Sequence, residues 1–222
     1  MKERIASVGL RAERGGGMSD IERGALIRRG LLLNYATIGY NTVEAVVSLI
    51  AGMLAGSVAL LGFGIDSVIE VTASGAAQWR LRSDAEPVRR EQVERISLRL
   101  IGACFLGLAA YVTIDAGKSL WLQERPNRTI VGVVILALSV FVMPLLARAK
   151  RDVADKMQSG ALRAEAKQTS LCAYLSFIAL AGVALNATFG WWWADPVAAL
   201  AMVPIIVVEG IAGLRAKVDD CC

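Results

Sequence analysis

The feature that most constrains this chain is a set of long apolar stretches separated by short polar links. A helix needs about 20 residues to cross a hydrocarbon core of about 30 Å. Backbone polar groups in lipid must be satisfied within their own segment, so each stretch predicts a transmembrane helix. The chain is therefore predicted to be an all-α integral membrane protein with six transmembrane helices, at 31–55, 57–79, 96–122, 129–146, 162–189 and 193–214.

The composition and the links agree with this prediction. The chain is 55% hydrophobic and 20% charged over 222 residues, with a mean hydropathy of +0.52. Such values are unusual for soluble domains. We expect a cytoplasmic N-terminal segment (1–24), a six-helix transmembrane domain (25–214) and a short cytoplasmic tail (215–222).

The distribution of Arg and Lys predicts the orientation. Basic residues gather in the N-terminal segment, in the links after the second and fourth stretches and in the tail, whereas the links after the first and fifth stretches are uncharged. Short cytoplasmic loops hold the basic excess, so both termini are predicted to be cytoplasmic. The net charge of +4 then reflects topology and contact with anionic lipid, not nucleic acid. The expected location is the inner (cytoplasmic) membrane of a bacterium.

Two acids interrupt the second stretch near its centre. Asp66 and Glu70 are four residues apart, so they share one helix face. An ionised acid at mid-membrane costs at least ~2.5 kcal/mol, so the pair needs a neutralising partner, and a bound cation is the simplest one. Hydrogen bonding between helices is the structural alternative.

The fifth stretch repeats part of this pattern 102 residues later. The run S-V-A-L begins at Ser57 and S-G-A-L begins at Ser159, which makes Gln168 and Cys172 the counterparts of the two acids. Counting ~1.5 Å per residue, the acids lie roughly 13 and 20 Å from the outer start of their span, and Gln168 and Cys172 roughly 9 and 15 Å from the inner start of theirs. All four are expected at one height, as an inverted repeat of three plus three helices requires.

Two runs of the sequence and its six-span plan resemble a known family. The runs GSVALLGFGIDSVIEVTAS and GWWWADPVAAL, together with the six-span plan, are similar to the cation diffusion facilitators, which export zinc and related divalent metals. The similarity covers about 34–214 and is most specific at 59–70. It implies metal and proton antiport by alternating access, a homodimer, and a ligand pair from each of spans two and five. By position, Asp66 and Glu70 match the pair in span two.

Span five departs from the family pattern. Gln168 and Cys172 stand where the family usually has His or Asp followed by Asp, and the chain contains no histidine. The large cytoplasmic C-terminal domain of many members is not expected either, because the chain ends soon after the sixth stretch.

The altered ligand set still suits a divalent metal. The two acids balance its charge, Cys172 adds a thiolate, and Gln168 offers only a neutral amide oxygen. Glu165, on the same face, is the favoured fourth partner. Carboxylate with thiolate favours Zn²⁺ or Cd²⁺, whereas the set without sulfur favours Mn²⁺ or Fe²⁺. Zn²⁺ is the leading substrate.

Each of these residues has a structural alternative. Cys172 suits a small packing position, Gln168 suits hydrogen bonding between helices, and Glu165 suits an interfacial charge pair with Lys167. Without metal, two neighbouring acids in a low dielectric cannot both stay ionised, so one should hold a proton. Metal entering from the cytoplasm would expel that proton, and protons from outside would expel the metal.

The remaining polar residues of the spans carry weaker predictions. A cation path or simple packing would explain Asn34, Asn41 and Glu44, Asp195 is expected to cap a helix, and Glu209 to lie at the membrane interface. The alternatives to a metal exporter are a non-metal cation transporter or channel and a non-transporting membrane scaffold. No catalytic or organic cofactor motif is found, so no enzyme is predicted.

Overall fold

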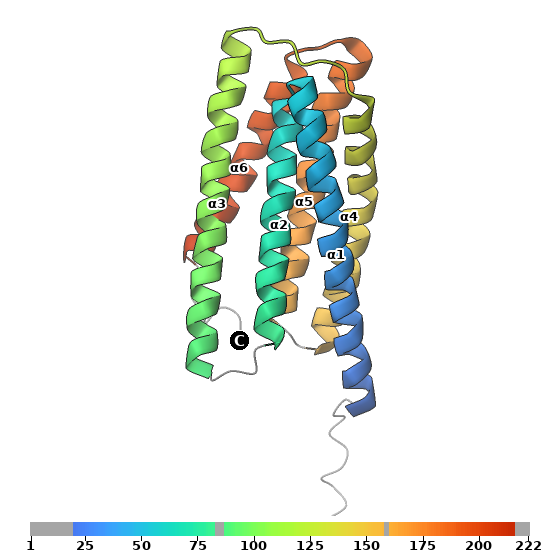
Figure 1. The fold of residues 1–222 in the computed structure, drawn as a ribbon, viewed down its shortest axis with the longest axis vertical. Coiled ribbons are helices and arrows are strands. Elements are labelled where there is room, and N and C mark those ends of the chain that lie inside the picture. Colours follow the sequence, from blue (N-terminus) through green and yellow to red (C-terminus); the bar gives the residue numbers. More distant parts are fainter. Residues whose placement is uncertain (1–19, 83–86, 158–159, 216–222) are drawn as a thin grey trace, which may run out of the picture.

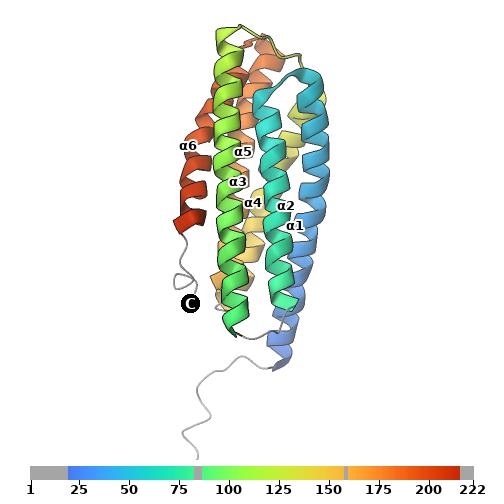
Figure 2. The same ribbon diagram turned by 60° about the vertical axis from the view of Figure 1, so that its left-hand side comes forward.

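The computed structural model describes residues 20–82, 87–157 and 160–215. This part of the chain is an elongated bundle of helices that run side by side, as two views 60° apart show (Figures 1 and 2). Six of its helices are long and apolar enough to cross a membrane, which agrees with the all-α prediction. The helices are α1 (Asp20–Ala55), α2 (Val58–Arg82), α3 (Pro87–Trp121), α4 (Ile130–Met157), α5 (Gly160–Phe189) and α6 (Ala194–Arg215).

The predicted spans are right in number, but several helices extend beyond them. The prediction ended the fourth span at residue 146, whereas α4 continues to Met157. Its last turns carry charges, yet Lys150, Val153 and Ala154 are buried there while Arg151 and Asp155 are exposed. The last turns of α4 are therefore amphipathic, with one buried face and one exposed face. A search for continuous apolar runs does not detect turns of this kind, so it ends the helix too early.

The links between helices lie at alternate ends of the bundle. The connections after α1, α3 and α5 lie at one end, and the described chain begins and ends toward the other (Figure 1). Helix α1 therefore begins at the far end of the bundle, and α6 points toward that end but stops about midway along the bundle. Which side is cytoplasmic remains a prediction from the basic residues.

The helix contacts follow a pairwise pattern. The most extensive pairs are α4 with α5, α3 with α6 and α1 with α2, and α2 also contacts α5 and α6. A three-plus-three repeat requires α1 and α2 to pair as α4 and α5 do, with α2 meeting α5 across the centre. The contacts have this form, while the repeat itself stays a prediction.

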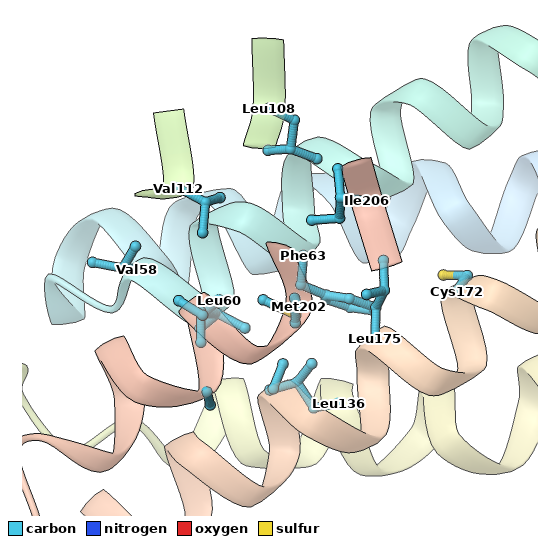
Figure 3. Close-up of a cluster of buried hydrophobic side chains, with 14 of the residues drawn as sticks. Val58, Leu60, Phe63, Leu108, Val112, Leu136, Cys172, Leu175, Met202 and Ile206 are labelled. Carbon is cyan, nitrogen blue, oxygen red and sulfur yellow. The ribbon is translucent and has the colours of Figure 1, made fainter. Parts of the chain in front are cut away.

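Helix α2 is the most enclosed of the six. Over the apolar window Val58–Gly75, 67% is buried, against 28–39% in the other helices. Leu60 and Phe63 of α2 pack with Leu136 and Met202 in the apolar cluster drawn in Figure 3. Asp66, Ser67 and Glu70 of α2 are accordingly buried inside the protein.

Small residues set two of the close contacts. Gly56, at φ +65°, allows the tight turn from α1 into α2. At Gly102 of α3, a Cβ would lie 2.7 Å from the carbonyl oxygen of Gly210 in α6. These two helices therefore pack backbone against backbone.

Asp195 does cap a helix, but not the one expected. It lies in the first turn of α6, and its Oδ2 accepts a hydrogen bond from the backbone N–H of Val58 at 2.9 Å, while its Oδ1 accepts one from Ser57 Oγ. The carboxylate thus caps the start of α2. The expectation that it caps its own helix was wrong, because a cap from a neighbouring helix leaves no local sequence signal.

Candidate metal site

Two acids of α2 line a small cavity inside the bundle. Asp66 and Glu70 are 4% and 3% exposed, and their spacing puts them on one face of α2. Gln168 and Cys172 of α5 line the same cavity. The structure therefore brings together the four side chains that the sequence predicted to meet.

The cavity has room for about one small ion. Its volume is about 10 Å³, close to the space that one water molecule needs. Figure 3 shows Cys172 beside Leu175 and Ile206, at one end of the apolar cluster. Apolar side chains complete the wall: Phe105, Leu171, Leu175, Ile205 and Ile206.

The carboxylate of Glu70 has no hydrogen-bond partner. Both of its oxygens are buried and unpartnered, and so is Nε2 of Gln168. Buried polar groups in folded proteins are nearly always paired, and an exception indicates an ion, a water or a proton. An orphaned carboxylate at the wall of an ion-sized cavity is the arrangement that a bound cation would satisfy.

The thiol of Cys172 lies close to both acids. Its side chain is 2% exposed and interacts with Asp66 and with Glu70. A thiolate facing two carboxylates would leave three negative charges without a counterion, which a low-dielectric interior does not tolerate.

The donors face one cavity without forming a finished coordination shell. Among the residues that the structure describes, no three Cys, Asp or Glu side chains are close enough to hold one metal ion together. Ligation by Asp66, Glu70 and Cys172 therefore needs these side chains to come closer together than they are in this conformation.

Glu165 is not part of the cavity wall. Its Oε2 lies 3.8 Å from Nζ of Lys150, which is fully buried between α4 and α5. Lys167, the partner that the sequence suggested, has its Nζ 3.9 Å from Oε2 of Glu209. This conformation therefore gives Glu165 an ion pair between helices instead of the place of the fourth ligand.

Glu209 is the residue that sequence reasoning missed. It lines the cavity from α6, together with Ile205 and Ile206, although it was expected to lie at the membrane interface. The available signal was an acid inside an otherwise apolar span, which is a candidate functional residue by default.

A second polar cluster lies between α1 and α2. Asn34 donates to Gln78 at 3.2 Å, and Glu44 accepts from Ser67 at 2.9 Å. Asn41 is also fully buried. None of these side chains lines the cavity, so α1 contributes polar groups to a separate region.

A comparison with known families identifies the family to which the chain belongs. The profile of the cation efflux transmembrane domain matches residues 35–220, which is most of the chain. The chain belongs to this cation efflux family. The resemblance to the cation diffusion facilitators is thereby confirmed, and the protein belongs to a family of integral membrane cation transporters, not of enzymes.

Two curated relatives are also transporters. The chain is 27% identical over 195 residues to the uncharacterized transporter sll1263 of Synechocystis, and 30% identical over 189 residues to the uncharacterized transporter YdbO of Bacillus subtilis. These alignments cover 84% and 82% of this chain, and 63% of each relative. The chain thus spans less than two thirds of the length of these relatives.

Proposed function

We propose that this cation efflux protein exports a divalent metal from the cytoplasm in exchange for protons, with Zn²⁺ the leading substrate. Asp66, Glu70 and Cys172 are the proposed ligands. The observation that carries this proposal is the orphaned Glu70 carboxylate, which lines an ion-sized cavity shared with the other two donors.

Charge and ligand chemistry favour a divalent, fairly soft metal. Two carboxylates neutralise a divalent ion, and a third anionic donor, the Cys172 thiolate, favours Zn²⁺ or Cd²⁺ over Mg²⁺. Gln168 contributes at most a neutral amide oxygen. Glu209 adds a further carboxylate on the α6 side of the wall, where it would attract the entering cation.

Proton exchange follows from the same groups. When the metal leaves, the acids and the thiol regain protons because they cannot stay charged together in a dry interior. Metal and protons thus compete for the same atoms, which couples the two movements without a histidine.

The test is a transport assay in proteoliposomes that reports Zn²⁺ and pH at once. The wild type should show saturable Zn²⁺ flux with opposite proton movement, and Asp66→Ala should abolish both. Asp115→Asn is the control, since Asp115 is an acid of α3 that hydrogen-bonds Tyr111 away from the cavity. Unchanged flux in Asp66→Ala would refute the site, and metal flux without proton movement would refute the antiport.

The proposal includes the assembly and location that the sequence predicts. These are a homodimer in the bacterial inner membrane with cytoplasmic termini. Light scattering on the purified protein measures the oligomeric state. Labelling of a terminal tag in intact and in opened cells shows on which side of the membrane the termini lie.

A further inference from the structure

The buried acid of α1 forms a second polar centre on another side of α2. Glu44 is 0% exposed, and one of its oxygens accepts a hydrogen bond from Ser67 Oγ at 2.9 Å. Helix α1 contacts both α2 and α4, as Figure 1 shows. Tyr40 of α1 and Ser139 of α4 are the other hydroxyl side chains that interact with the carboxyl group.

Two more polar side chains lie on the same face of α1. Asn41 is three residues before Glu44 and Ser48 is four residues after it, which is the spacing of neighbours on a helix face. Both are 0% exposed. We call the set of Asn41, Glu44, Ser48, Ser67 and Ser139 the Glu44 centre.

The centre has more polar atoms than partners. Oε1 of Glu44, both amide atoms of Asn41 and Oγ of Ser48 are buried without a hydrogen bond. In the described part of the chain, no Lys or Arg forms an ion pair with Glu44. Among these atoms, Oε1 of Glu44, Oδ1 of Asn41 and Oγ of Ser48 are oxygens that a cation can bind, whereas Nδ2 of Asn41 is a donor that needs an acceptor instead.

Ser67 and Ser176 each face two acceptors but have one hydroxyl proton to donate. Ser67 Oγ lies within hydrogen-bond distance of Glu44 and of the Phe63 carbonyl, at 2.9 and 3.1 Å, but a serine has one proton to donate. Ser176 likewise faces Ser139 Oγ and the carbonyl of Cys172, at 2.9 and 2.6 Å. Each of these two serines therefore leaves one of its two acceptors without a proton from that serine.

The donor set identifies the class of cation. One carboxylate balances a single charge, and the other donors are neutral hydroxyl and amide oxygens, without a sulfur or nitrogen ligand. Oxygen donors of this kind suit a hard ion. A proton would occupy one carboxylate oxygen and leave Asn41 and Ser48 unpaired, whereas a metal ion engages several oxygens at once.

We propose that the Glu44 centre binds Na⁺, at a site separate from the transported metal. The effect on the metal rests on the proposed function. Glu44 and Glu70 interact electrostatically, and the Ser139 and Ser176 hydroxyls connect the centre to the backbone of Cys172. Na⁺ next to Glu44 reduces the negative potential at the metal cavity, so it should weaken Zn²⁺ binding, and by reciprocity Zn²⁺ should weaken Na⁺ binding.

The experiment measures the two ions separately on purified protein. Retention of ²²Na⁺ reports the Glu44 centre, and Zn²⁺ titration calorimetry in NaCl or in choline chloride of equal ionic strength reports the coupling. Na⁺ should raise the Zn²⁺ Kd of the wild type about fivefold, the lower end of typical coupling between sites. Glu44→Gln should lose ²²Na⁺ binding and the Na⁺ effect while still binding Zn²⁺. Asp115→Asn, the matched control, should keep both.

A milder variant protects the test against misfolding. Ser48→Ala removes one proposed oxygen ligand and should weaken ²²Na⁺ binding several-fold. Wild-type protein that retains no ²²Na⁺, or Na⁺ binding unchanged in both Glu44→Gln and Ser48→Ala, overturns the proposal. If Asp66→Ala loses Zn²⁺ but keeps ²²Na⁺ binding, the two ions occupy separate sites, as proposed. If the wild type binds Na⁺ but no divalent metal, the proposed function fails and the Glu44 centre stands.

Discussion

The two polar regions that flank α2 differ in charge and in donor type. The cavity region gathers the acids of α2 with the Cys172 thiol and the Glu209 carboxylate. The Glu44 centre has a single acid surrounded by neutral oxygens. Asp66 and Ser67 are adjacent in sequence but point about 100° apart on a helix, so one rod presents two chemically distinct faces to its neighbours.

This difference teaches how one enclosed helix can serve two ions. A soft, multiply charged region favours a divalent metal, and a hard, singly charged region favours a monovalent one. The two regions have no residue in common. The four predictions below test the separation, beginning with the largest effect.

Removing the charge of Glu70 should have the largest effect. Even outer-shell partners of a metal are worth 10–100-fold in affinity, so loss of a ligand charge in Glu70→Gln should lower Zn²⁺ affinity by about 100-fold or more. Glu44→Gln should stay within about fivefold of the wild type. Titration calorimetry in Na⁺-free buffer measures both variants, and equal losses in the two would break the distinction between the regions.

Replacing the buried thiol should change which metal is preferred. Cys172→Ser keeps the size of the side chain but replaces sulfur with a poor ligand, so the preference for Cd²⁺ and Zn²⁺ over Mn²⁺ should fall about tenfold, or ~1.4 kcal/mol. Cys104→Ser is the matched control, because Cys104 is an exposed free cysteine on α3. Competition titrations with the three metals give the ratio, and an unchanged ratio would assign Cys172 to packing.

Loss of the Asp195 cap should destabilise α2, the helix that carries residues of both polar regions. Asp195→Ala removes the acceptor for the Ser57 hydroxyl and for the N–H of Val58 and should cost ~1–2 kcal/mol of stability. Thermal unfolding in detergent, followed by tryptophan fluorescence, should show a lower midpoint than for Asp115→Ala. A midpoint equal to that of the control would mean that packing alone holds α2 in place.

The smallest effect is expected at Glu209. Its carboxylate lines the cavity but also pairs with the exposed Lys167 at 3.9 Å. Glu209→Gln should therefore weaken Zn²⁺ binding only about two- to fivefold, as expected for a partly screened charge. A loss as large as that of Glu70→Gln would make Glu209 a ligand and move the centre of the site toward α6.

Much of this architecture was readable in the sequence because hydropathy reports burial in lipid directly. The spans and the four cavity residues of α2 and α5 followed from stretch length, helix periodicity and depth. The start of α1 and the end of α4 did not, since both helices continue beyond the apolar run into charged turns where hydropathy falls. Spacing along the chain also could not show that α6 brings Glu209 to the same wall.

The predicted contacts of Asp195 and Glu165 were wrong for the same reason. Asp195 caps another helix, and Glu165 pairs with Lys150 on α4. Both contacts depend on which helices are neighbours and on how far one slides past the other. A sequence reveals pairs within one helix, such as residues four apart, whereas contacts between helices require the packing to be known.

The cap by Asp195 also determines how α2 can move. If α2 tilts about its capped N-terminal end, each residue moves by an amount that grows with its distance from that end. Asp66 and Glu70 lie about 12 and 18 Å along the helix from Val58, and a tilt of about 10° would shift them by roughly 2 and 3 Å. Such a tilt would change the position of the acids relative to Cys172, while the anchored end of α2 stays against α6.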